Sequence, residues 1–265
     1  MIDVIAVYGS PHSGKGAVSL AIAASLAAKK KETIVLSGDR VTPMLKVYAP
    51  KDDIPQSLSV GGLLMDADLT EKTVTERVVI HSKSPYLGFM GMASSENITT
   101  YDIHFNPERI QSLFSILYRY VDYLIVDCSC NILYDDIARH GMENATVMLE
   151  LLTPDMQGLE FWRSMQPILK DDRFSQARRV PVINPAKPIS PVRELQEVGK
   201  AVLGEIKYVL PYSHEVEDRM MCGKLIKWLG RREGIAFENQ LERLVKFEIL
   251  KKGLGITDGR TKKSQ

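Results

Sequence analysis

Short apolar runs alternate with longer segments of helical character along most of the chain. The apolar runs predict strands at residues 4–8, 33–36, 87–90, 123–126, 146–152, 180–183 and 206–210. Helical spacing or high alanine content predicts helices at residues 14–29, 107–120, 154–169 and 236–252. Residues 43–76 carry turn signals and predict irregular chain with short helical pieces.

Strands that are apolar throughout and are separated by helices are typical of a parallel sheet covered on both faces. The pattern therefore predicts a doubly wound α/β fold, with a mostly parallel sheet in a three-layer α/β/α arrangement. We find no internal repeat and no Pro/Ser-rich linker in the 265 residues, which indicates one domain over residues 1–252. Residues 253–265 are polar and basic and predict a disordered tail.

Charge and cysteine content restrict the class of protein. The 34 Lys and Arg balance 33 Asp and Glu, so the chain lacks the strongly basic character of a dedicated nucleic-acid binder. Three cysteines are too few for a disulfide framework and indicate a reducing compartment. No apolar run approaches the ~18 residues of a membrane span. The lysines at 29–31 follow the apolar stretch 17–28, the reverse of a signal peptide, so we expect a cytoplasmic protein.

The first predicted strand leads into a phosphate-binding loop. The loop fits G-x-x-x-x-G-K and opens a helix; its residues are Gly9, Ser10, Pro11, His12, Ser13, Gly14, Lys15 and Gly16, with Ala17 next. Glycines let backbone N–H groups surround phosphate oxygens, the helix N-terminus adds partial positive charge, and Lys15 reaches the outer phosphates. Gly16 replaces the Ser or Thr that ligates Mg²⁺ in such loops. A Gly-rich turn with a solvated lysine is the alternative interpretation.

Residues at four other strand ends are further candidates. Asp127 ends an apolar strand, where a carboxylate can hold Mg²⁺, and Asp39 could orient a water molecule or a metal-bound water. Asn184 can hydrogen-bond an adenine edge, and Pro211 and Tyr212 could pack against the base. We predict the two aspartates as catalytic and metal-binding residues, and the other three as nucleotide-binding residues. Turn chemistry at strand ends is the alternative for each.

Together these motifs resemble the ParA/MinD group of P-loop ATPases, the deviant-Walker-A branch of the SIMIBI class. The resemblance runs from Ile2 to about Leu244 and depends on residues 9–16, 39, 122–127, 184 and 209–212. More specifically, divergent ParA-like proteins from Gram-positive mobile elements and from pilus or secretion operons, related to TadZ and CpaE, are similar to this chain. The segments that carry this likeness are 6–15, 38–43, 87–91 and 126–128.

The resemblance implies binding of ATP or ADP with Mg²⁺ and a homodimer that holds nucleotide between its subunits. It also implies a protein partner in a pilus or secretion machine or in a partition machine. The family's signature lysine falls at Ser10 and its Mg²⁺-binding threonine at Gly16, so we expect weak or absent hydrolysis. A nucleotide-insensitive scaffold that keeps the fold only for partner binding is the alternative. A small-molecule kinase or synthetase is a third hypothesis, and no lid motif supports it.

Some features invite other interpretations. Cys128 and Cys130 form a C-x-C motif, and Cys130 falls at a cluster-ligand position of nitrogenase iron proteins, but buried structural thiols are the expectation. An apolar stripe over residues 237–245 is similar to a MinD-type membrane helix, and we expect it to pack in the core instead. Lys227, Arg231 and Arg232 could contact DNA phosphates, but a solvated face is the expectation.

Overall fold

The structure is a computed structural model in which residues 3–50, 54–102, 104–185, 192–224 and 226–250 are described. Apolar runs become the strands β1 (Asp3–Gly9), β2 (Thr33–Ser37), β3 (Val79–Ile80), β4 (Leu87–Gly91), β5 (Tyr123–Asp127), β6 (Val147–Leu152), β7 (Arg178–Ile183) and β8 (Tyr208–Val209). Within the described residues these strands form one sheet in the order β3-β4-β2-β5-β1-β6-β7-β8. β3 is antiparallel to β4, and the other neighbouring pairs are parallel.

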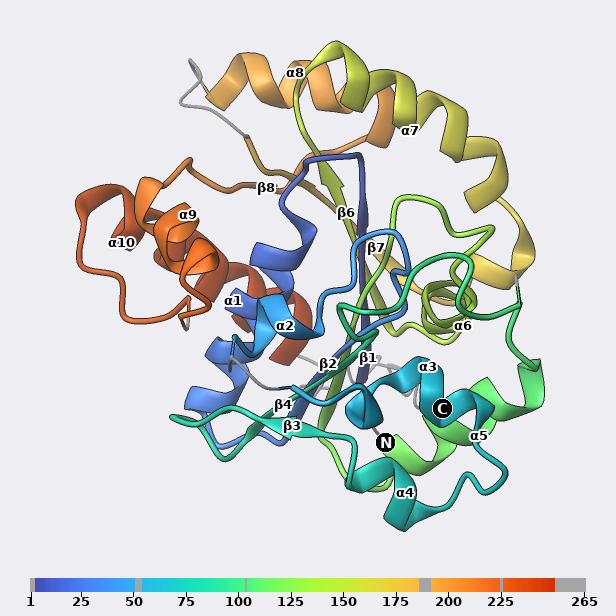
Figure 1. The fold of residues 1–265 in the computed structure, drawn as a ribbon. Helices are drawn as coiled ribbons and strands as arrows, with labels where there is room; N and C mark the ends of the chain where they lie inside the picture. Colours follow the sequence, from blue (N-terminus) through green and yellow to red (C-terminus); the bar gives the residue numbers. More distant parts are fainter. Residues whose placement is uncertain (1–2, 51–53, 103, 186–191, 225, 251–265) are drawn as a thin grey trace, which may run out of the picture.

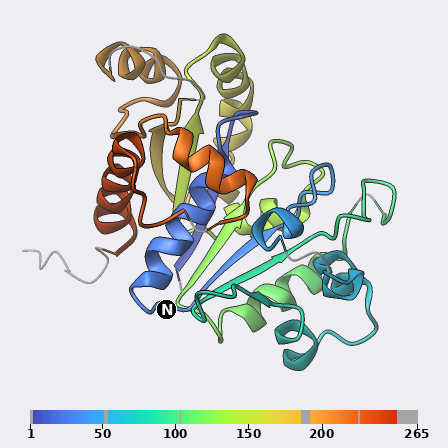
Figure 2. The same ribbon diagram turned by 60° about the vertical axis from the view of Figure 1, so that its left-hand side comes forward.

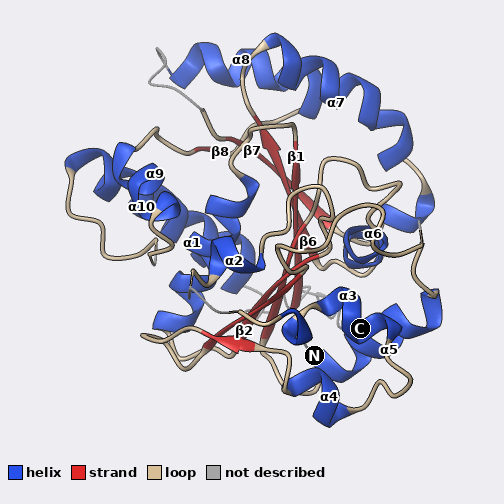
Figure 3. Ribbon diagram, in the orientation of Figure 1, coloured by secondary structure: helices blue, strands red, loops and turns tan. Residues whose placement is uncertain are grey.

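Helices cover both faces of this sheet (Figures 1 and 3). One face carries α1 (Lys15–Ala28), α2 (Leu45–Tyr48), α9 (His214–Met221) and α10 (Arg232–Leu244). The other face carries α3 (Val60–Met65), α4 (Glu71–Thr75), α5 (Pro107–Leu117), α6 (Asp136–Glu143), α7 (Met156–Leu169) and α8 (Val192–Leu203). The predicted three-layer, mostly parallel α/β fold is therefore confirmed.

Local sequence explains how the long helices begin. Asn106 caps α5 by accepting a hydrogen bond from the backbone N–H of Glu108, with Pro107 in the first turn. Asp155 caps α7 by accepting from the N–H of Gly158. Helix α1 differs, since Gly14 is its first flanking residue and offers no capping side chain. Its alanines let α1 approach the sheet closely, and residues 18–27 are all buried.

The C-terminal helices pack beside α1. Figure 2 shows the orange and red segments of α9 and α10 next to the blue helix α1. The apolar stripe predicted to enter the core does so, because Phe237, Leu241, Leu244 and Val245 are all buried. After α10 the chain continues through a π-helical turn, η3 (Val245–Ile249). Residues 253–265, predicted to be a disordered tail, lie outside the described residues.

Several elements were not among the predicted segments. α6 and α9 have eight residues each and β3 has two, so they are shorter than the windows in which periodicity is recognised, whereas α8 is a longer amphipathic helix whose periodic pattern was missed. No helix in the described part of the chain combines the length and apolar character that crossing a bilayer requires. The fold places β1 between β5 and β6, where the sheet's connections change direction. Ligands of such sheets bind at this switch point, outside the carboxyl ends of the strands.

Candidate functional site

The loop predicted to bind phosphate lies at this switch point, between β1 and α1. Its backbone takes left-handed conformations at His12 (φ 58°) and Gly14 (φ 75°). In the described part of the chain, no side chain caps α1 at Gly14, so its first N–H groups face the loop without a side-chain acceptor. Open N–H groups at a helix N-terminus form a ready anion site.

Three hydrogen bonds fix the shape of the loop. The N–H of Ser10 donates to the carbonyl of Leu151 at 3.1 Å, and the Oγ of Ser10 accepts from the N–H of Thr153 at 3.2 Å. Ser10 is fully buried by these contacts. Asn184 Nδ2 donates to the carbonyl of Ser13 at 2.7 Å. The side chain at position 10 therefore faces the sheet.

Lys15 is folded back along the loop. Its Nζ donates to the carbonyls of Gly9 (3.3 Å) and Ser10 (3.2 Å) and contacts Cys130 Sγ at 2.9 Å. Cys130 is half-buried, so it is not the fully buried thiol that we expected. Cys128 is buried as predicted, and burial raises the pKa of its thiol well above the usual value. The lysine ammonium thus lies inside the loop, where phosphate oxygens could replace its present partners.

A cavity of about 430 Å³ opens beside the N-terminus of α1. Its lining includes six predicted site residues: His12, Gly14, Ala17, Asn184, Pro211 and Tyr212. Other lining residues come from α9 and α10, among them Val216, Glu217, Met220 and Phe237. This volume lies within the range of small-molecule sites. The structure therefore brings the predicted base-side residues and the phosphate loop to one hollow.

Asp127 lies next to Gly16 and is deeply buried. It is 5% exposed, and its Oδ2 accepts a hydrogen bond from the hydroxyl of Tyr48, which is 2% exposed. Burial raises the pKa of Asp127 to about 6, against the lowering effects of Tyr48 and Lys15. Burial also raises the pKa of the Tyr48 phenol well above its usual value. The hydroxyl therefore stays protonated and is the donor of this hydrogen bond.

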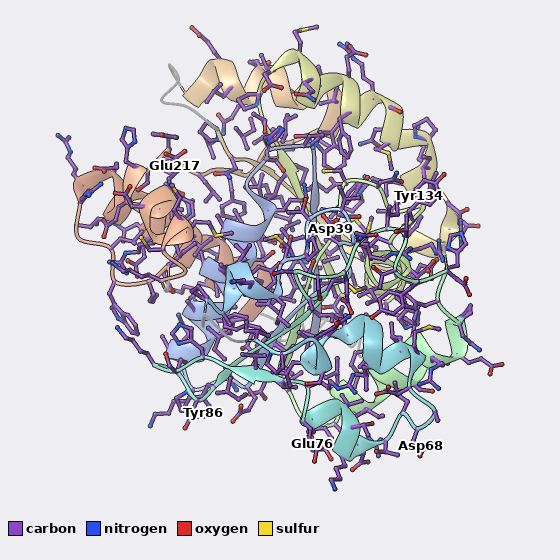
Figure 4. The ribbon with its side chains drawn as sticks, viewed as in Figure 1. Asp39, Asp68, Glu76, Tyr86, Tyr134 and Glu217 are labelled. Atoms are coloured by element: carbon purple, nitrogen blue, oxygen red, sulfur yellow. The ribbon has the colours of Figure 1, made fainter. Side chains whose placement is uncertain are left out.

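Two further carboxylates lie near Asp127. Asp135 caps α6 by accepting from the N–H of Ala138 at 2.9 Å, and burial raises its pKa to about 6. Asp39 accepts from the N–H groups of Val41 (2.8 Å) and Thr42 (2.9 Å), which is a turn contact. Figure 4 shows Asp39 near the middle of the molecule. Its charge contributes to raising the pKa of both Asp127 and Asp135.

The surroundings of Gly16 test whether Mg²⁺ fits. A Cβ atom built on Gly16 would lie 2.9 Å from Cε of Met44 and 3.2 Å from Cε of Met220. The same atom would lie 3.3 Å from Oδ2 of Asp127, the oxygen that Tyr48 already occupies. Across the described residues, no three His, Cys, Asp or Glu side chains converge as metal ligands. As placed, these residues do not fit Mg²⁺, and the metal-binding roles of Asp39 and Asp127 stay predictions.

Comparison with solved structures identifies the fold. MinD complexed with Mg-ADP from Pyrococcus horikoshii aligns with 15% identity over 96% of this chain and 100% of that chain, at a TM-score of 0.70. A ParA family ATPase from Chlorobium tepidum aligns with 14% identity over 92% and 99%, also at 0.70. The chain has the MinD/ParA fold. The MinC:MinD cell division complex from Aquifex aeolicus matches at 15% identity, 96% and 100% coverage and a TM-score of 0.67.

No protein-family model and no curated protein matches the sequence at a significant level. The MinD/ParA likeness is thus one of fold, and the roles of the individual site residues stay predictions. Two side chains at the site were missed from sequence. Asp135 gives a local signal, since an aspartate before a short helix is a typical cap. Tyr48 gives none, because its partner Asp127 is 79 residues away along the chain.

Proposed function

We propose that this chain binds ATP or ADP at the loop of residues 9–16 and acts as a positioning or assembly factor of the ParA/MinD type. One observation carries the proposal: the uncapped N-terminus of α1, the loop lysine and a cavity of nucleoside size meet at the switch point of a MinD/ParA fold. None of these features alone would identify a nucleotide site. Their convergence is typical of one.

Different residues of the site would contact the phosphates and the base. Backbone N–H groups of the loop and of the first turn of α1 would hold phosphate oxygens, and Lys15 would exchange its carbonyl partners for them. Pro211 and Tyr212 would flank the base in the cavity. Asn184 donates to the loop and lines the same cavity, so it links the two parts of the site.

Hydrolysis in this proposal is weak or absent. Phosphoryl transfer is catalysed chiefly by positioning and by cations near the transferred group. Position 10 holds a buried serine instead of the family's signature lysine, and position 16 holds glycine instead of a hydroxyl residue. Asp127 and Asp39 would be the remaining candidates for catalytic roles, and both carboxylates already accept protein hydrogen bonds.

The likeness in fold to solved MinD and ParA structures supports a general proposal for the cellular role. MinD from Aquifex aeolicus forms a complex with MinC, and the Chlorobium tepidum match is a ParA family ATPase. We propose by analogy a cytoplasmic protein that forms a nucleotide-linked homodimer and binds a protein partner. A pilus or secretion machine, or a machine that maintains mobile elements, would supply that partner. Binding to DNA or to a membrane surface is not favoured.

Lys15→Ala tests nucleotide binding. The substitution removes the loop charge aimed at the outer phosphates, and a charge-assisted hydrogen bond contributes roughly 1.5–3 kcal/mol. We therefore expect affinity for ADP and ATP to fall by about tenfold or more, measured by isothermal titration calorimetry of the full chain. Lys72→Ala is the control, because Lys72 is an exposed lysine on α4 and lies outside the site.

Two outcomes would contradict the proposal. Wild-type protein that binds neither nucleotide would favour the scaffold alternative, in which Lys15 serves only to hold the loop. Equal affinities for wild type and Lys15→Ala would show that nucleotide binds elsewhere. Circular dichroism of each variant checks that the fold is kept.

A further inference from the structure

The hydroxyl of Tyr48 occupies the carboxylate that was predicted to bind Mg²⁺. Tyr48 ends α2, and its side chain is buried against β4, with its ring centroid 5.7 Å from that of Phe89. Its hydroxyl donates to Oδ2 of Asp127. A buried carboxylate needs a hydrogen-bond donor or a cation as partner. Here a neutral hydroxyl from the same chain provides the donor.

Thioether methyl groups lie close to the point where a side chain at position 16 would begin. Cε of Met44 and Cε of Met220 both lie within 3.2 Å of a Cβ atom built on Gly16. Met44 comes from the segment before α2, and Met220 comes from α9, so two separate elements contribute these methyl groups. Mg²⁺ requires oxygen ligands in octahedral geometry and usually keeps several waters. Methyl groups offer no such ligand.

The two neighbouring carboxylates also accept hydrogen bonds from the protein backbone. Asp39 Oδ1 accepts from two backbone N–H groups of its own turn. Asp135 accepts from the N–H of Ala138 with Oδ1 and from the N–H of Ser129 with Oδ2. Asp127 and the two carboxylates near it therefore all have partners within the protein.

We propose that this chain binds its nucleotide without Mg²⁺, the Tyr48 hydroxyl taking the metal's place as the partner of Asp127. The inference rests on the proposed nucleotide binding at the same loop. The negative charge of the phosphates is then met by Lys15 and by the N–H groups at the start of α1. Glycine at position 16 fits this arrangement, because a larger residue would meet Met44 and Met220.

Calorimetric titration of wild-type protein with ADP, once in excess EDTA and once in excess Mg²⁺, tests the inference. We expect binding in EDTA at least as tight as in Mg²⁺. Binding that appears only with Mg²⁺, or that is about tenfold tighter with it, would overturn the inference and leave the proposed function standing. No binding under either condition would overturn the proposed function itself.

Tyr48→Phe provides a second test with a readout besides nucleotide affinity. The variant keeps the ring but leaves the buried Asp127 carboxylate without its hydrogen-bond donor. We expect its melting temperature to rise when Mg²⁺ is added, because a cation can now serve Asp127, while the wild-type value stays unchanged. A wild-type melting temperature that rises with Mg²⁺ as much as that of the variant contradicts the inference.

Tyr118→Phe is the matched control. The Tyr118 hydroxyl is buried and has no hydrogen-bond partner among the described residues, so its removal should not change the response to Mg²⁺. The wild-type titrations require no variant. They therefore decide the inference even if Tyr48→Phe does not fold.

Discussion

Two buried or half-buried carboxylates in this molecule have partners of different kinds. Asp127 accepts from the neutral hydroxyl of Tyr48, and burial raises its pKa to about 6. Glu242 on α10 accepts from the ammonium groups of Lys29 (2.7 Å) and Lys227 (2.5 Å) and from Ser25 Oγ (2.5 Å). Burial opposes its ionisation, yet these bonds lower the pKa of Glu242 to about 2. The two residues should therefore affect stability in opposite directions as pH changes.

Asp127→Asn tests the first of these effects. A carboxyl pKa near 6 when folded and about 3.9 when unfolded means that the folded state binds more protons between these values. The free energy of unfolding then falls as pH rises through this window, by roughly 3 kcal/mol from this residue. Asparagine does not titrate and still accepts from Tyr48. We expect the variant to be more stable than wild type at pH 7, with the gain vanishing near pH 4.

Chemical denaturation of both proteins across this pH range measures the difference. Asp68→Asn is the control, since Asp68 is exposed at the edge of the molecule (Figure 4). A difference between Asp127→Asn and wild type that does not change with pH would show that burial does not control the ionisation of Asp127.

Single-residue signals in the sequence were sufficient to locate the loop but not its surroundings. Residues 9–17 were predicted from glycine spacing and a lysine, which are local features. The contacts of Tyr48 and Met220 with this site join segments far apart in the chain, and no local pattern encodes them. Lys227 is a further example, because it was expected on a solvated face and is instead buried between Glu238 and Glu242.

At the scale of elements, the core strands were predictable because each is buried on both faces. A strand that touches helices on both sides is mostly apolar, and such runs stand out in a sequence; β5 carries one charged residue, Asp127 at its end, and β6 carries one, Glu150. Helix α6 lacks that signal, since its eight residues include three charged side chains and a histidine. The docking of α10 on α1 depends on Glu242 and its cationic partners as well as on the apolar stripe.

Glu242→Ala tests this link between α1 and α10. The substitution removes the acceptor of three hydrogen bonds and leaves Lys227 with Glu238 as its remaining partner. Hydrogen bonds to charged groups contribute roughly 1.5–3 kcal/mol each, but the contributions of bonds that share one acceptor are not additive. Because Glu242 is also partly exposed, we expect the free energy of unfolding to fall by about 2 kcal/mol in total. Because the pKa of Glu242 is lowered, its contribution is present at neutral pH and is lost as pH falls from about 4 toward 2.

Thermal and chemical denaturation at pH 7 measure the loss. Glu160→Ala on α7 is the control, because Glu160 pairs with Arg163 on an exposed surface and should matter little. Equal stability of Glu242→Ala and wild type would show that apolar contacts alone hold α10 against α1.

For the whole molecule, the order of strands could not be predicted by adding up local patterns. Periodicity gives the elements in chain order, whereas the sheet places β1 and β5 side by side although more than a hundred residues separate them. The resemblance to the ParA/MinD group implied the α/β fold, which the structure confirms, but the order of the strands was not predicted. The group's dimer requires more than the fold, because residues from each subunit must meet nucleotide bound to the other.

The residue at position 10 also bears on self-association. In the family a lysine at the position of Ser10 reaches across the dimer, but here that position holds a fully buried serine whose Oγ accepts from Thr153. A nucleotide sandwich would therefore lack its cation in trans.

We expect a concentration-dependent monomer–dimer equilibrium in which ATP strengthens association by less than about tenfold, since one bridging charged contact accounts for roughly that factor. Sedimentation velocity over a concentration series, with and without ATP, measures it. Lys15→Ala should abolish the ATP effect and leave the nucleotide-free equilibrium unchanged. A tight dimer that is indifferent to ATP would place the interface elsewhere on the molecule and would favour the scaffold alternative.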